Sequence, residues 1–196
     1  MIEIATLDKL QTRIVRRLEK ELHPKFTYHS FYHTLDVIEA SERIGMAEGL
    51  SDDEVNLVKL AAAYHDAGFI ISDDNHEERS CEMLREEAAD SLEPEVIETL
   101  CSMIIATKVP QRPSNLMEKV LCDADLDYLG REDFPEISNS LFEEFKVRGV
   151  VQGEQDWINL QISFFETHKY WTAYSQEFRE PGKQSTLQSL RLDAAV

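Results

Sequence analysis

The stretch 51-SDDEVNLVKLAAAYHDAGF-69 decides the fold class, because it joins a helix start to a long apolar run. Ser51 and Glu54 stand three residues apart, the spacing of a capping box, which predicts that a helix begins here. The run from Val55 to Ala63 is almost wholly apolar, which indicates a buried helix. Gly68 stands where such a helix is expected to stop.

This buried helix ends in two polar residues that face inward. His65 follows Val58, Ala61 and Ala62 at helical spacing, so it lies on the same face as these apolar residues. Asp66 stands beside it, and burying a carboxylate is costly unless a cation or a donor compensates. A hydrogen-bonded core histidine and a metal ligand are both open interpretations of His65 at this point.

The preceding helix, expected over 31–48, carries a second inward histidine. Val37, Ala40 and Ile44 repeat at spacings of three and four, which is the buried side of an amphipathic helix. His33 lies four residues before Val37 and therefore on that same side.

A third inward group comes from 118-EKVLCDADLDYLGR-131, where three aspartates stand two residues apart. Asp125 lies four residues from both Leu121 and Leu129, so it points toward the core. The other two aspartates lie on a different face, where spacings of four predict a solvated charge ladder. Its members are Lys119, Asp123, Asp127 and Arg131.

Two histidines and two carboxylates on the inward faces of three helices suit one divalent metal ion with nitrogen and oxygen ligands. This mixture favours Mn, Fe, Co, Ni or Zn, with Mg as an option where oxygen and water dominate. Protein ligands that leave part of the coordination shell open would leave room for water and a substrate oxygen.

Helical periodicity recurs along the whole chain, which has only 7 glycines and 6 prolines in 196 residues. We therefore predict an all-α fold, a single bundle of about seven to eight helices. Residues 1–179 are expected to form one domain, and residues 180–196 a polar C-terminal tail with one weakly amphipathic turn. The expected helices are 6–22, 31–48, 52–67, 77–90, 94–107, 116–129, 132–147 and 155–174.

Composition limits the partners. The chain has 38 acidic and 20 basic residues, a formal charge of −18, which makes long nucleic acids poor partners. The three cysteines form no CxxC pair and fit buried, reduced thiols. No apolar run is long enough to span a bilayer and no secretory signal is visible, so we expect a cytoplasmic protein without a membrane partner. A homo-oligomer is left open.

Three motifs, 32-YHTLDV-37, 61-AAAYHDAGF-69 and 122-CDADLDYLG-130, together resemble the HD-domain superfamily of metal-dependent phosphohydrolases. The resemblance runs from about residue 27 to residue 174. It looks closest to predicted HD phosphohydrolases with an "EERS"-like segment after the His-Asp pair, a "TK"-like helix end and "DADLxxLG". It implies a helical bundle around a metal that activates a water to attack phosphorus. The implied metal ligands are His33, His65, Asp66 and Asp125, with Asp66 also counted as catalytic.

One departure from the family pattern concerns the acid or base. Several HD nucleotidases have a glutamate three residues after the motif's aspartate, whereas this chain has Phe69 there. His76 and Glu77, at the next helix start, are the nearest catalytic candidates; a helix-terminal pair without function is an equal alternative. His29 and Lys108 are candidates for substrate binding, His29 also for a second metal.

The leading hypothesis is therefore a phosphohydrolase that acts on a small phosphorylated compound, with a nucleotide as the favoured example. A second hypothesis is an HD-type diiron oxygenase, which needs His29 and His76 as extra ligands. A third is a non-catalytic, metal-stabilised nucleotide-binding or regulatory module, which Phe69 makes conceivable.

Overall fold

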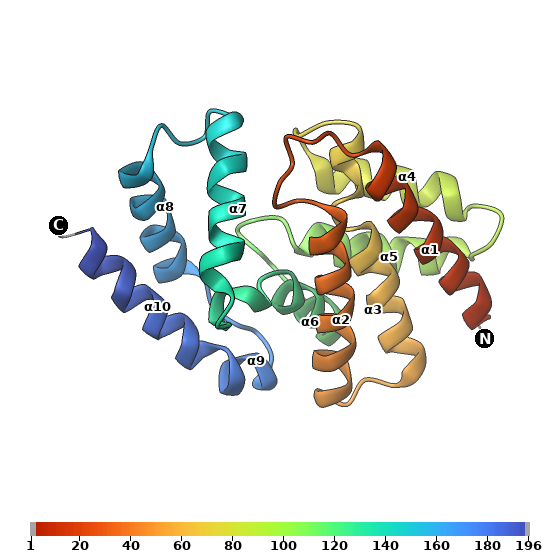
Figure 1. The fold of residues 1–196 in the computed structure, drawn as a ribbon. Helices are drawn as coiled ribbons and strands as arrows, with labels where there is room; N and C mark the ends of the chain where they lie inside the picture. The colour runs from red at the N-terminus through yellow and green to blue at the C-terminus, as the bar shows by residue number, and fades with distance from the viewer. Residues whose placement is uncertain (1–2, 195–196) are drawn as a thin grey trace.

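The computed structural model describes residues 3–194, and this part of the chain is helical throughout, as predicted (Figure 1). It contains ten α-helices and two short 3-10 helices, η1 and η2. In chain order they are α1 (Ile4–Glu21), α2 (Phe31–Ala47), α3 (Asp52–Tyr64), η1 (Ala67–Ile70), α4 (His76–Ala88), α5 (Pro94–Ala106), α6 (Leu116–Asp125), η2 (Asp127–Gly130), α7 (Phe134–Val147), α8 (Glu154–Thr167), α9 (Ala173–Phe178) and α10 (Glu180–Asp193).

The eight expected helices correspond to α1–α8, but three of them end three or more residues earlier than predicted. The helix expected over 52–67 stops at Tyr64, and the helix expected over 116–129 stops at Asp125; a 3-10 turn follows each. The helix expected over 155–174 stops at Thr167, because the next residues are extended and pack against α6. The predicted capping box at Ser51 is confirmed.

The first core lies between helices α1 to α6 and is mainly aliphatic. Helix α3 runs through its middle, and its residues from Leu60 to Tyr64 are fully buried. Helices α1, α2, α5 and α6 all pack against it. The apolar run from Val55 to Ala63, which predicted this helix, therefore lies at the centre of the first core.

The second core lies between η2, α7, α8 and α10, and half of its buried members are aromatic residues and half are leucines. In Figure 1 these helices stand together on the side of the molecule away from α1 and α4. Its buried members are Tyr28, Leu126, Tyr128, Leu129, Phe134, Phe165, Leu187 and Leu190.

The predicted polar tail is wrong for the described residues up to 194, because α10 is a docked helix. Leu187 and Leu190 enter the second core, and Lys183, only 1% exposed, donates to the His168 carbonyl at 2.9 Å. Helix α10 lies very close to η2. A Cβ on Gly182 would lie 2.2 Å from the Gly130 oxygen, so glycine is required at position 182. Residues 195 and 196 of the predicted tail lie outside the described part.

Within residues 3–194, the helices are too short or too polar for any of them to cross a membrane.

Candidate metal centre

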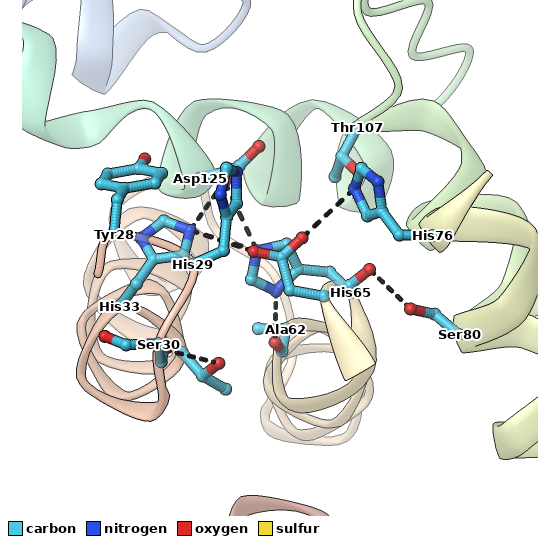
Figure 2. Close-up of polar contacts among 12 residues, drawn as sticks. Tyr28, His29, Ser30, His33, Ala62, His65, His76, Ser80, Thr107 and Asp125 are labelled. Atoms are coloured by element: carbon cyan, nitrogen blue, oxygen red, sulfur yellow. Dashed lines mark hydrogen bonds and ion pairs between the residues drawn. The ribbon is translucent and has the colours of Figure 1, made fainter. Parts of the chain in front are cut away.

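The four predicted ligands meet where α2, α3 and α6 converge. His33 lies in the first turn of α2, His65 and Asp66 directly follow α3, and Asp125 is the last residue of α6. Figure 2 shows His33, His65 and Asp125 directed at one another. The ligand atoms of His33, His65 and Asp66 all lie within 4.8 Å of one another.

The donor atoms are spaced as ligands of one ion would be. His33 Nε2 lies 3.2 Å from Asp125 Oδ1 and 3.3 Å from His65 Nε2. His65 Nε2 lies 3.2 Å from Asp66 Oδ2 and 3.4 Å from Asp125 Oδ1. Ligands that share an ion at the usual distances of about 2.0–2.2 Å lie about 3 Å apart. These four side chains therefore suit a single divalent metal.

Two local features confirm that the set fits a metal. Asp66 Oδ2 is buried and has no hydrogen-bond partner, which is costly unless a cation pairs with it. The His65 ring donates from Nδ1 to the Ala62 carbonyl at 2.7 Å, which turns Nε2 toward the cluster.

Electrostatics keep both carboxylates ionised. Burial would raise the pKa of Asp66, but His65 and His76 hold that pKa well below its usual range. Burial likewise opposes the charge of Asp125, yet hydrogen bonds from His33 and His65 hold its pKa low. Ionised carboxylates are the form in which a metal is bound.

The turn after α3 is held in place by α4. Ser80 Oγ donates to the His65 carbonyl at 2.8 Å and accepts from the Gly68 amide at 2.9 Å. A Cβ on Gly68 would lie 2.0 Å from the His76 oxygen, so only glycine lets the start of α4 come this close. This approach brings His76 to the metal cluster.

The predicted charge ladder is wrong, although the choice of Asp125 agrees with the structure. Asp123 is fully buried and accepts from the backbone amides of Trp171 and Thr172. Asp127 is 1% exposed and accepts from Arg43 and Arg179, each at 2.8 Å. The face expected to meet solvent is covered by α9 and by the extended segment before it.

The catalytic candidates of the α4 start lie beside the cluster. His76 Nε2 is 3.4 Å from Asp66 Oδ1 and 3.5 Å from Glu77 Oε1, and Glu77 is 6% exposed. Phe69, which replaces the glutamate of some HD nucleotidases, stacks on the His76 ring with centroids 4.1 Å apart. Phe69 therefore packs against the imidazole ring of His76.

The substrate-binding candidates lie on two sides of the same opening. Lys108 is 41% exposed and pairs with Glu78 at 2.7 Å, while Glu77 lies 3.8 Å away. His29 packs against Phe69, with ring centroids 4.5 Å apart. Both residues line the cavity described below.

Sequence reasoning missed Glu144, a fully buried residue of α7 that holds His29. Glu144 Oε1 lies 2.6 Å from His29 Nδ1, and Arg148 donates to the same oxygen at 3.0 Å. Its Oε2 accepts from the backbone amides of Tyr28 and His29. The available signal was weak: Glu144 follows Leu141 by three residues on the apolar side of the helix.

A cavity of about 410 Å³ opens directly from the cluster. Asp66 and Asp125 lie in its wall at one end, and residues of α7 and α8 form the other end. This volume lies within the range of small-molecule sites, roughly 300–1,000 Å³. Two residues of the cluster, Asp66 and Asp125, thus share one cavity with the catalytic candidates and the substrate-binding candidates.

The sequence model of the HD domain matches residues 30–127, and the chain therefore belongs to the HD-domain family. The matched segment contains all four residues of the cluster. A solved structure of a predicted HD superfamily hydrolase from an uncultured Thermotogales bacterium has a similar fold, with a TM-score of 0.63. That likeness covers 96% of this chain and 91% of the other at 19% identity. No curated protein matches the chain.

Proposed function

We propose that this protein is a metal-dependent phosphohydrolase that cleaves a phosphoester of a small phosphorylated compound. The observation that carries the proposal is the cluster of four donor side chains beside a ligand-sized cavity, with Asp66 and Asp125 in the cavity wall. A divalent ion held there would polarise a phosphoryl oxygen and lower the pKa of the attacking water. Mn, Fe, Co, Ni, Zn and Mg are the candidate ions.

The surrounding side chains have distinct proposed roles. His33, His65, Asp66 and Asp125 hold the ion, and Asp66 Oδ1 also orients the His76 ring. His76 and Glu77 are the groups that can hold the proton needed by the leaving oxygen. Lys108 and His29 flank the phosphate, and Glu144 fixes the His29 ring so that its Nε2 is free. That the substrate is a nucleotide stays a prediction from the sequence.

The test is a phosphate-release screen of the purified protein, stripped of metal and reloaded with each candidate ion in turn. We expect release only with metal, and its loss in His65→Ala. The matched control is His23→Ala, because His23 is exposed and lies outside the cavity. Release that survives in His65→Ala, or that needs no metal, would contradict the proposal.

The same preparation separates the two alternatives predicted from the sequence. A diiron oxygenase would show two irons per chain, with optical bands of a coupled pair. A non-catalytic module would bind metal and ligand tightly but release no phosphate from any ester. His29 is poorly placed as a second-site ligand through Nδ1, since Glu144 already occupies that nitrogen.

A further inference from the structure

The cavity next to the metal cluster has two chemically different ends. One end carries ionisable side chains from the start of α2, the turn after α3, the start of α4 and the end of α5. The other end is formed by α7 and α8 and is dominated by apolar rings and branched chains. Its apolar members from these helices are Phe134, Leu141, Phe145, Trp157, Leu160, Phe164 and Phe165.

The α7–α8 end offers a ligand almost no polar partner. Although 30% of the chain is charged, no charged side chain from these two helices lines the cavity in the described structure. Its two polar members bond to each other, because Gln161 Nε2 donates to Ser138 Oγ at 2.8 Å. Sugar hydroxyls or base heteroatoms placed there would lose their water without gaining partners.

The ionisable end suits one phosphate better than several. Among the described residues that line the cavity, Lys108 is the one lysine or arginine, and Glu77 and Glu78 stand near it. The chain carries a formal charge of −18, so a diphosphate or triphosphate would meet strong repulsion. A single phosphate brings the least negative charge to this end, where a bound ion and Lys108 would face it.

Given the proposed function, on which this rests, we infer that the substrate is a phosphate monoester with an apolar, hydrocarbon-rich body. The phosphate lies at the metal end and the body lies between α7 and α8. In the reaction, the oxygen of water bonds to phosphorus and the ester P–O bond breaks. The leaving oxygen takes up a proton, which gives an alcohol and inorganic phosphate.

The first test is a series of primary alkyl phosphates from ethyl to hexyl, hydrolysed under one metal concentration. The leaving groups are chemically alike, so chain length changes only the apolar surface that can be buried. We expect kcat/KM to rise about fourfold for each added methylene, on the order of 100-fold over the series. Glycerol phosphate, hexose phosphates and nucleoside monophosphates should fall below hexyl phosphate. A flat series, or a nucleoside monophosphate as the best substrate, overturns the inference.

A matched pair of variants ties the preference to the cavity. Leu160 in α8 lines it and is 39% exposed, so Leu160→Gln should fold. Leu116 in α6 is 38% exposed and lies outside it, which makes Leu116→Gln the control. We expect Leu160→Gln to reduce the hexyl-over-ethyl ratio at least threefold and Leu116→Gln to preserve it. Equal ratios in the two variants count against the inference.

A binding measurement separates this inference from the proposed function. Trp157 lines the cavity, so a Trp171→Phe protein reports on it through the remaining indole. Hexylphosphonate, which cannot be hydrolysed, should change the emission at lower concentration than ethylphosphonate does. If hexylphosphonate binds more tightly but no ester releases phosphate, the inferred apolar ligand is supported and the hydrolase proposal is contradicted. If esters are hydrolysed but the two phosphonates bind alike, the inferred apolar ligand is contradicted while the hydrolase proposal is not.

Discussion

The region of α1–α6 and the region of η2, α7, α8 and α10 differ in what they bury. The first encloses an aliphatic core and presents the cluster of His33, His65, Asp66 and Asp125 at its edge. The second encloses a core of aromatic rings and leucines and forms the apolar wall of the cavity. The HD-domain match spans 30–127 and so ends where η2 begins. The cluster that lies within the HD-domain match therefore belongs to the first region. The apolar wall of the cavity belongs to the second region.

Buried carboxylates join the two regions. Asp127 bonds Arg43 of α2 and Arg179, which precedes α10. Asp123 of α6 binds the extended segment at Trp171 and Thr172. We therefore predict that substitutions at the cluster abolish metal binding and phosphate release. Substitutions at Asp123 and Asp127 should instead lower the free energy of unfolding and leave metal binding in place.

The largest expected effect is at the cluster itself. His65→Ala should abolish metal binding and phosphate release together, because the remaining donors no longer surround an ion. The loss should exceed the roughly 10–100-fold that removal of a supporting residue causes. Metal analysis of both proteins after identical dialysis checks this; undiminished metal in the variant would falsify the ligand assignment.

Metal removal should destabilise the first region. Without the ion, the carboxylates of Asp66 and Asp125 are close neighbours, and the buried Asp66 Oδ2 has no hydrogen-bond partner. At a metal concentration of about 100 Kd, linkage predicts a loss of about 2.7 kcal/mol in unfolding free energy. That corresponds to a Tm lower by about 5–10 °C in a chain of this size. Equal melting curves for the chelated and metal-loaded samples would contradict the fit.

Asp123→Asn and Asp125→Asn test the difference between a residue that links the two regions and a residue of the cluster. Asp125→Asn should lower metal affinity, since it removes a charge from the ligand set. Asp123→Asn should keep the metal but lower the unfolding free energy by about 2 kcal/mol, as it weakens hydrogen bonds to a buried charge. Metal titration and thermal melts of both variants decide it. If Asp123→Asn loses the metal and Asp125→Asn keeps it, the helical-face assignment is wrong.

Glu144 of α7 connects the second region to the cavity, because it bonds the ring of His29, a substrate-binding candidate. Glu144→Gln should lower kcat about tenfold, the lower end of the effect of a supporting residue, with metal content unchanged. The exposed neighbour Glu143, replaced as Glu143→Gln, is the control. Normal turnover in Glu144→Gln would mean that His29 needs no fixed orientation.

The smallest effect is a pH dependence of the second region. Burial, followed by the charge of Lys183, lowers the pKa of His168 to about 3. The unfolded chain, with a pKa near 6.5, takes up the proton first. This contribution to stability is therefore complete above about pH 6.5 and is lost as the pH falls toward 3. It is worth about 1 kcal/mol between pH 8 and pH 5.5.

Replacing the group tests that dependence. Thermal melts at pH 8 and pH 5.5 should show a smaller loss in His168→Gln than in the unaltered protein. His23→Gln, at an exposed histidine, should retain the full loss. Equal losses in all three proteins would assign the acid sensitivity to other groups.

Local patterns were sufficient to predict the helices and the inward ligands. Ser51, the apolar run of α3 and the spacings around His33, His65 and Asp125 all act within a few residues. Helix geometry turns such spacings directly into faces. The same reasoning could not see that α3 and α6 stop before their 3-10 turns, because packing decides where a helix ends.

The sequence by itself therefore determined an all-α chain with four polar groups aimed at its core. Only the tertiary structure decided which surfaces are covered. Asp123 was expected in solvent because its cover, Thr172, lies 49 residues away in the chain. Glu144 lies 115 residues from His29, and the docking of α10 depends on Gly130 and Gly182 meeting. Helical periodicity carries no information about partners at such distances, since the path of the whole chain brings them together.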